Sequence, residues 1–507
     1  MIEALPFEAP LDDILFSLRA AGGREDALST EVITHFARFA TDKIAPLDAI
    51  GDAQGCRLED GKVLMPDGFD MVYRQLAEDG WQGLTLPEEH GGQGMDALTL
   101  AGVSEIFSGA NHALQMVTAL VSGAGSVLMR FGTPEQQARL IPLLADGRYL
   151  STMALTEAGA GSDLSTIRCS ARRDGDIWRI TGEKIFISGG GQNLSEGILH
   201  LVLARSSGAK GIKGLSLFAC LSHRPDGSLN SVSVNRIEEK MGLHASPTCH
   251  MIFDEAEAEL IGAEGQGLQA MFAMMNHARI DVALQGVAHA ARATDLARRY
   301  AAGRVQGRGA DGAPVTIDMH ADVARMIDSC DRLALGGRAL CHLLLAADAR
   351  GEHDLVDFLT PVAKVFCSEA GITAADLAIQ VMGGYGYLRE YGAERNWRDA
   401  RICAIYEGAN GIHARGLATR AISVNDGAGA KAFAAFLEKH GLGEEAKHWS
   451  SEAERLRQLA DPQQEAHDFM RLTGALAHQA ACNVLLGAAQ VSGQNSRISR
   501  VLMLIST

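Results

Sequence analysis

The sequence lacks any CxxC pair, although it contains nine cysteines. These cysteines are scattered and odd in number, which argues against a disulfide framework and against a zinc site. We therefore expect free, buried thiols in a protein of the reducing cytoplasm. The cysteines stand at positions 56, 169, 220, 249, 330, 341, 367, 403 and 482.

Long apolar runs are also missing: none reaches the roughly 18 residues that span a bilayer, so we expect no membrane insertion. The N-terminal stretch MIEALPFEAPLDD has neither the basic start nor the apolar core of a signal peptide. Basic charge is in deficit, since the formal net charge is −16 and the isoelectric point is about 5.5. That balance disfavours nonspecific binding to nucleic acid or anionic membranes. We predict a cytoplasmic protein with no nucleic-acid partner.

The chain length of 507 residues exceeds one compact core, and domains of about 100–200 residues predict three or four of them. Hydrophobic residues make up 47% of the chain and charged residues 21%, as in a globular protein. Glycine is abundant at 56 residues, so we expect many tight turns and close backbone approaches, which a large cofactor needs.

The hydrophobic pattern changes twice along the chain. Apolar residues recur at helical spacing before residue 150 and again from residue 267 onward. Between these regions, short β-like segments predict strands at 178–188, 199–206, 214–222 and 250–255. The predicted fold class is mainly α with a central β domain, an order that a single parallel α/β sheet would not show. We divide the chain into an N-terminal helical domain with a leader (1–150), a middle β domain (151–260), a C-terminal helical domain (261–422) and, after a Gly/Asp-rich linker, a helical appendix (431–507).

Three segments combine glycines with polar groups. Residues 153–163 (MALTEAGAGSD) offer backbone N–H groups and hydroxyls to polar cofactor atoms. Residues 380–387 (QVMGGYGY) end a long helix at a glycine pair, where the backbone can approach a ligand closely. In residues 405–410 (IYEGAN), the apolar neighbourhood of Glu407 can raise the pKa of its carboxyl and make it a base. Singly, the three are compatible with a plain connection, a helix C-cap and a surface carboxylate.

Together, these segments resemble the acyl-CoA dehydrogenase family, from about Gly83 to Ile422. The string QVMGGYGYLREYGAERNWRDARI is similar to the family signature nearly position for position. The resemblance implies a helical domain, a β-barrel-like domain and a four-helix-bundle domain. The leader (7–18), the helical appendix and the strings KIFISGG, LHLVLAR, KMGLHASPT, MFAMMNHARI and RVQGR resemble a larger bacterial subgroup, which includes 3-methylmercaptopropionyl-CoA dehydrogenases.

The resemblance implies bound FAD and no metal. Phe186 and Ser188 match a Trp and a Thr that stack on and hydrogen-bond the isoalloxazine ring in the family. Arg304 matches a residue that reaches the FAD pyrophosphate from the neighbouring subunit, and Gln380 and the glycines after it match an adenine-side contact. The implied cofactor-binding set is Met153, Leu155, Thr156, Ser162, Phe186, Ser188, Arg304, Gln380, Gly383 and Gly384.

Glu407 matches the family's catalytic base. Some members carry the base on a long helix immediately before an Arg, but that position is Ala278 in this chain. The resemblance implies that the thioester carbonyl accepts hydrogen bonds from the Glu407 N–H and a ribityl hydroxyl, that Glu407 removes the α-proton, and that a hydride passes to flavin N5. The implied substrate-binding set is Ser162, Asn276, Arg279 and Gly408.

The expected reaction is desaturation of an acyl-CoA to the 2-enoyl-CoA. The substrate expected from the subgroup is short or contains sulfur, such as 3-methylmercaptopropionyl-CoA. The expected electron acceptor is an electron-transfer flavoprotein, and the expected assembly is a homodimer. Three alternatives stay open: an oxidase that uses oxygen, an enzyme that eliminates a substituent, and a DNA-binding flavoprotein of the same fold. The last of these calls for a basic face, which the net charge disfavours.

Overall fold

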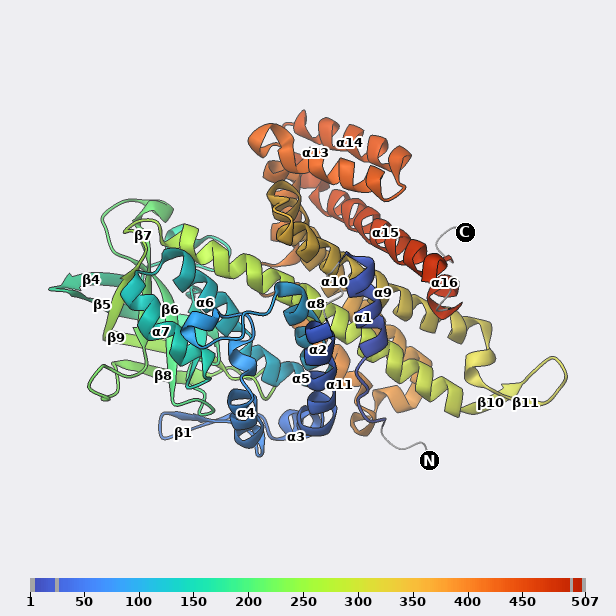
Figure 1. Cartoon of the computed structure of the whole chain (residues 1–507), viewed down its shortest axis with the longest axis horizontal. Coiled ribbons are helices and arrows are strands. Elements are labelled where there is room, and N and C mark those ends of the chain that lie inside the picture. Colours follow the sequence, from blue (N-terminus) through green and yellow to red (C-terminus); the bar gives the residue numbers. More distant parts are fainter. Residues whose placement is uncertain (1–4, 23–26, 493–495, 504–507) are drawn as a thin grey trace. The chain divides into compact units, whose positions relative to one another are not determined.

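The computed structural model describes residues 5–22, 27–492 and 496–503. Helices dominate and a seven-stranded sheet interrupts them, so the expected class, mainly α with a central β domain, is confirmed. The chain forms two compact units, and each draws on separate stretches of sequence (Figure 1). The first unit comprises Met1–Thr41, Ala97–Ala110 and Arg279–Thr507, and the second comprises Asp42–Asp96 and Asn111–Ala278.

The second unit contains the seven-stranded sheet, a small hairpin and several helices. The sheet strands are β3 (Tyr149–Ala154), β4 (Ser170–Asp174), β5 (Ile177–Ser188), β6 (Gly197–Arg205), β7 (Leu215–Leu221), β8 (Val232–Ile237) and β9 (Thr248–Ile261). The hairpin pairs β1 (Arg57–Glu59) with β2 (Lys62–Leu64). The helices are α3 (Pro46–Gln54), α4 (Phe69–Glu78), α6 (Leu120–Phe131), α7 (Pro134–Ala145) and the C-terminal part of α5 (Ala97–Thr118).

The seven-stranded sheet closes on itself. Its order is β3-β6-β4-β5-β9-β7, and β7 also pairs with β6, so five of the strands form a ring. β3 runs parallel to β6 at the side of this ring, and β8 pairs with β9. Nearly every residue of β6 is buried, which explains its almost continuous apolar sequence. The ring has the barrel-like form that the resemblance implies.

The start of α7 follows from its sequence. Thr133 is the N-cap: its hydroxyl accepts a hydrogen bond from the Gln136 backbone N–H at 3.3 Å. The Gln136 side chain accepts one in return from the Thr133 N–H at 3.0 Å, and Pro134 occupies the first helical turn. This capping box satisfies two of the donors that a helix start leaves unpaired. The helix ends at Ala145, a few residues before β3 begins.

The first unit is built from long helices. They include α1 (Leu11–Ala20), α2 (Ala27–Phe39), the N-terminal part of α5, most of α8 (Gly267–Gly303), α9 (Ala321–Ala349), α10 (His353–Met382), α11 (Ala393–Ala400) and α12 (Asn410–Gly416). The C-terminal helices are α13 (Val424–Lys439), α14 (Gly443–Arg457), α15 (Ala466–Ser492) and α16 (Ser496–Met503). A small hairpin, β10 (Val305–Arg308) with β11 (Pro314–Thr316), separates α8 from α9.

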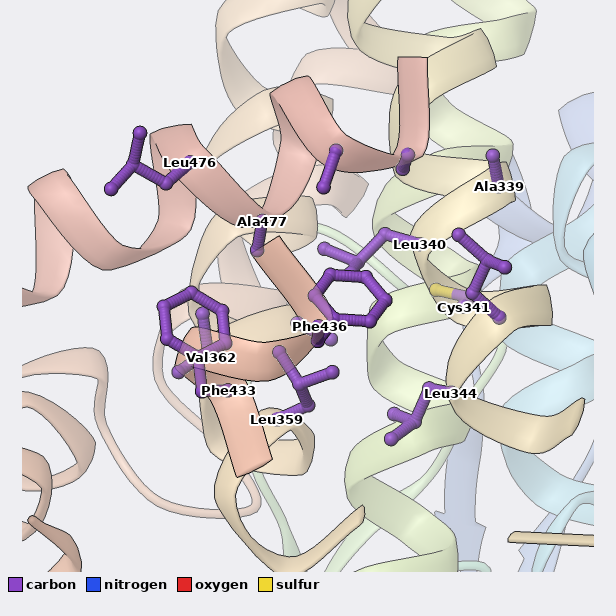
Figure 2. Close-up of a cluster of buried hydrophobic side chains, with 14 of the residues drawn as sticks. Ala339, Leu340, Cys341, Leu344, Leu359, Val362, Phe433, Phe436, Leu476 and Ala477 are labelled. Carbon is purple, nitrogen blue, oxygen red and sulfur yellow. The ribbon is translucent and has the colours of Figure 1, made fainter. Parts of the chain in front are cut away.

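The C-terminal helices share a core with the bundle helices α9 and α10. Figure 2 shows Leu340 of α9, Leu359 of α10, Phe433 of α13 and Ala477 of α15 in one buried cluster. Trp449 of α14 joins the same core, where its ring lies 4.7 Å from that of Phe433. Burial of each large apolar side chain contributes about 1.5–3 kcal/mol, so the appendix is an integral part of the first unit.

One continuous helical stretch among the described residues is apolar and long enough to cross a membrane by composition. This stretch, His353–Tyr387, includes α10, and 56% of its most apolar window is buried inside the protein. Burial at that level is typical of a core helix, and α10 packs against α9, α13 and α15.

Several short elements of the fold differ from the prediction. The strands β3, β4 and β8 and the hairpin β1–β2 were not predicted, because they are three to six residues long and carry weak patterns. The expected linker at 424–430 is wrong in part, since α13 begins at Val424. Asn425, Asp426 and Gly427 nevertheless adopt positive φ angles and interrupt this helix at its start, as a Gly/Asp-rich sequence favours.

Candidate active site

The loop that carries Glu407 has an unusual backbone. Glu407 has a φ of 53° and Gly408 a φ of 98°, both in the left-handed region. A residue other than glycine pays a steric cost there, of about 1–3 kcal/mol in held positions. Such a conformation persists only where the surroundings fix it, and it is frequent at functional sites.

Three side chains fix the two backbone carbonyls of this loop. Arg279 on α8 donates from Nε to the Glu407 oxygen at 3.4 Å, and His413 on α12 donates from Nε2 to the same oxygen at 3.0 Å. Lys364 on α10 donates from Nζ to the Gly408 oxygen at 2.8 Å. Three helices therefore hold the loop in its strained conformation. This conformation sets the position of the Glu407 carboxyl.

The Glu407 carboxyl is a weaker acid than an ordinary glutamate. Burial raises its pKa to about 7, while the positive charges of Arg279 and Lys364 oppose the rise and the negative charge of Asp281 adds to it. A base works best when its pKa lies near the working pH. The loop thus holds a carboxylate that can accept a proton at neutral pH.

Lys364 was not singled out from the sequence. It is fully buried on α10, and its Nζ also donates to Asn410 Oδ1 at 2.9 Å. Burial lowers its pKa to about 8. A lysine within the apolar helical stretch around 359–366 was the available signal, because a buried lysine nearly always has partners.

A pocket of about 350 Å³ opens where α10 ends. Arg304, Gly383 and Gly384 line it, together with Tyr300, Tyr385 and neighbouring apolar residues. The Arg304 guanidinium lies over the Tyr385 ring, 5.6 Å from its centroid. In the part of the chain that the structure describes, no atom beyond the neighbouring residues lies within 4 Å of the place where a Cβ of either glycine would be. The structure thus brings three of the expected FAD residues together, whereas Gln380 is exposed and does not line the pocket.

The chemistry of this pocket fits the phosphate-bearing half of FAD. A guanidinium is suited to phosphate oxygens, and bare glycine backbone allows close approach. The aromatic walls offer flat surfaces to a base.

The expected isoalloxazine residues lie in the second unit. The Ile185 N–H donates to the Thr156 oxygen at 2.8 Å, which places Leu155 and Thr156 beside Phe186 on β5. Phe186 sits in a bulge of β5 with a φ of 59°, and 61% of its surface is exposed. An aromatic ring held outward in a strained conformation fits a stacking role.

The remaining expected residues of the second unit lie on β3, on the loop after it, at the end of β5 and on α8. Met153 lies on β3 and Ser162 on the exposed loop after it, while Ser188 ends β5 opposite Thr248. Asn276 lies on the part of α8 that belongs to this unit and is half-buried. The first unit holds Arg279, Arg304, Gln380, Gly383, Gly384, Glu407 and Gly408.

Comparisons with known proteins identify the family of this chain. Three domain families match in chain order: the acyl-CoA dehydrogenase N-terminal domain at residues 29–148, the middle domain at 152–256 and the C-terminal domain at 265–422. The 3-methylmercaptopropionyl-CoA dehydrogenase of Ruegeria pomeroyi is 39% identical over 465 residues, which span 85% of this chain and 79% of that protein.

Solved structures agree on the fold. ACDH-11 of Caenorhabditis elegans, solved with C11-CoA, superposes with a TM-score of 0.82 at 20% identity and covers 99% of this chain and 91% of its own. An acyl-CoA dehydrogenase of Bacillus anthracis complexed with FAD superposes with a TM-score of 0.75 at 20% identity, covering 94% and 85%. The expected fold, the expected FAD cofactor and the resemblance are therefore confirmed. The chain belongs to the acyl-CoA dehydrogenase family of FAD-dependent enzymes.

Proposed function

We propose that this enzyme desaturates an acyl-CoA between Cα and Cβ, with Glu407 as the base that takes the α-proton. The observation that carries the proposal is the Glu407 carboxyl, which has a pKa of about 7 and lies on a strained loop that three side chains hold in place. In the reaction, the α C–H bond breaks and its proton goes to the Glu407 carboxylate. Bound FAD supplies the acceptor for the hydride that leaves Cβ as the double bond forms.

The rest of the loop orients the thioester. The Glu407 backbone N–H would donate to the thioester carbonyl, whose oxygen gains negative charge as the α-proton leaves. Arg279 and Lys364 place positive charge near the same loop, which favours the negative transition state. Gly408, Ser162 and Asn276 complete the proposed substrate-binding set, and Arg279 is proposed to hold the CoA moiety as well.

The proposed FAD-binding residues of the first unit are Arg304, Gln380, Gly383 and Gly384. Those of the second unit lie on β3, on the loop that follows it and on β5. When FAD is bound, Phe186 would stack on its ring system and Ser188 would hydrogen-bond to it. The assembly is a homodimer in which Arg304 serves the FAD of the neighbouring subunit. The division into domains at 1–150, 151–260, 261–422 and 431–507 is part of the same proposal.

The proposed substrate is a short or sulfur-containing acyl-CoA, because the Ruegeria relative is a 3-methylmercaptopropionyl-CoA dehydrogenase. An electron-transfer flavoprotein is the proposed acceptor, and the cytoplasm is the proposed location, which suits nine free thiols. A panel of acyl-CoAs that differ in length and β-substituent, assayed with an artificial acceptor, identifies the substrate. Release of a β-substituent or of peroxide under air would instead indicate elimination or oxidase activity.

The variant Glu407→Gln tests the base. We expect it to retain bound FAD and to lose turnover by at least about 100-fold, since general bases contribute about 10²–10⁴. Glu438→Gln, which removes an exposed carboxylate on α13, is the matched control and should leave turnover unchanged. Near-normal turnover in Glu407→Gln would refute the assignment.

A further inference from the structure

A second carboxylate, that of Asp281, lies on α8 and is linked to the Glu407 loop. Its Oδ1 accepts a hydrogen bond from the Ser104 hydroxyl on α5, and its Oδ2 accepts one from Gln285 Nε2 at 3.0 Å. Gln285 Oε1 in turn accepts a hydrogen bond from the hydroxyl of Tyr406. Because Tyr406 directly precedes Glu407, a chain of hydrogen bonds runs from α5 through α8 to the base.

The hydrogen bonds of this series run in a defined direction at Asp281. The Tyr406 hydroxyl donates to the Gln285 amide oxygen, so the amide NH₂ group faces Asp281. Each Asp281 oxygen then receives a donor, one from an amide and one from a hydroxyl. Neighbouring side chains therefore hold both carboxylate oxygens of Asp281 in place.

The side chains that form this series of hydrogen bonds are mostly shielded from water. Ser104 is 6% exposed and Gln285 is 1% exposed, while Asp281 and Tyr406 are half-buried. A hydrogen bond is stronger in such surroundings, and a buried polar group that loses its partner is destabilising. The chain is therefore able to fix the side chain of Tyr406 and, through it, the start of the loop.

The charges that act on Glu407 come from two helices. Arg279 and Asp281 lie on α8 and Lys364 lies on α10, and all three act on the Glu407 carboxyl. Burial keeps His413 on α12 neutral, because its pKa is lowered to about 4. Burial also keeps the Cys403 thiol and the Tyr406 hydroxyl protonated, because it raises the pKa of each. Without Asp281, Glu407 would face two cations and no anion.

We propose that Asp281 is a positioning residue for the dehydrogenation: its hydrogen bonds through Gln285 and Tyr406 hold the loop, and its negative charge acts on the Glu407 carboxyl. The inference rests on the proposed function of Glu407. Two carboxylates in one site then have different tasks: Glu407 accepts the proton and Asp281 holds the loop.

The variant Asp281→Asn tests the charge, since it keeps the size of the side chain. The protonation of Glu407 is followed in the FAD-loaded enzyme by infrared difference spectroscopy, using the carboxyl band that disappears in Glu407→Gln. We expect the midpoint of this band to move to lower pH by about one unit, because a like charge has been removed. The acid limb of the kcat profile should move in the same direction, and kcat at pH 8 should fall because the base is weaker.

Two further variants separate charge from position. Asp281→Glu restores the charge, so the infrared midpoint should return toward that of the wild type. Tyr406→Phe removes the hydrogen bond to Gln285 but keeps Asp281, so kcat should fall about tenfold with little change in the infrared midpoint. Asp357→Asn, which removes an exposed carboxylate on α10, is the control and should change neither quantity.

The outcomes distinguish this inference from the proposed function. An unchanged midpoint in Asp281→Asn, or an unchanged kcat in Tyr406→Phe, would overturn the role of Asp281 while leaving Glu407 as the base. Turnover retained in Glu407→Gln would overturn the proposed function itself. If Asp281→Asn fails to bind FAD, Tyr406→Phe still decides whether the chain positions the loop.

Discussion

Lys364 on α10 donates a hydrogen bond to the backbone oxygen of Gly408, 44 residues away in the sequence, at 2.8 Å. The same ammonium group lowers the pKa of Glu407, against the larger effect of burial. One side chain therefore fixes the shape of the loop and moderates the basicity of its carboxyl. The two effects can be separated by substitution.

The variant Lys364→Met should move the acid limb of the kcat profile to higher pH. The base must be ionised to act, and loss of a nearby cation raises the pKa of Glu407 above its value of about 7. We expect a shift of about one pH unit, so turnover falls most at pH 6–7 and least at pH 9. Steady-state rates measured between pH 5.5 and 9.5 check this.

Lys364→Arg keeps the positive charge and should leave the acid limb in place, even if kcat falls because the loop is held less well. Lys447→Met removes an exposed lysine on α14 and should change nothing. An acid limb that moves to lower pH in Lys364→Met would contradict the electrostatic role.

The variant Arg304→Gln should weaken FAD binding. In the proposed site, its guanidinium supplies charged hydrogen bonds to phosphate, each of which contributes about 1.5–3 kcal/mol. The dissociation constant of FAD should therefore rise roughly 10- to 100-fold, which the cofactor retained after dialysis measures directly. Arg308→Gln removes an exposed arginine four positions on, at the end of β10, and should retain FAD. Equal retention in both variants would remove Arg304 from the FAD site.

Much of the fold could be predicted from local sequence patterns. The helix start at Thr133 and Pro134 follows from capping rules. The glycine pair at the end of residues 380–387 predicts a helix end, and α10 ends there, with Gly383 as its C-cap. The longer strands β5, β6 and β7 could be found because their apolar residues recur over seven or more positions. Short strands such as β4 gain their stability from pairing with β5, which no local pattern contains.

Some features of the candidate site could be predicted from the sequence, and others could not. Glu407 could be predicted because it matches the position of the base in the family that the sequence resembles. The positive φ of Glu407, which sets the position of its carboxyl, could not be predicted. The roles of Lys364 and Asp281 depend on contacts between α10, α8, α5 and the loop, separated by dozens to hundreds of residues. Such contacts exist only in the folded chain.

A buried ion pair in the first unit predicts where that unit is most sensitive to substitution. Glu105 on α5 and Arg338 on α9 are each 1% exposed, and Arg338 Nε lies 2.9–3.0 Å from both Glu105 carboxylate oxygens. Arg338 Nη2 donates to Oε1 at 2.6 Å, which makes the contact bidentate. Desolvation of two charges is costly, so the pair stabilises the fold only while both partners are present.

The variant Glu105→Gln should lower the free energy of unfolding by about 3–5 kcal/mol, because it removes the bidentate carboxylate from the buried Arg338 charge, whose contact with Asp13 is longer, at 4.0 Å. For a unit of this size the melting temperature should fall by roughly 5–10 °C. Glu31→Gln, an exposed change on α2, is the control and should melt with the wild type. The double variant Glu105→Leu with Arg338→Met removes both charges and should recover most of the loss, since apolar pairs of similar volume often replace buried ion pairs without penalty. If the double variant melts lower than Glu105→Gln, the pair has a favourable free energy of its own and is more than a matched set of buried charges.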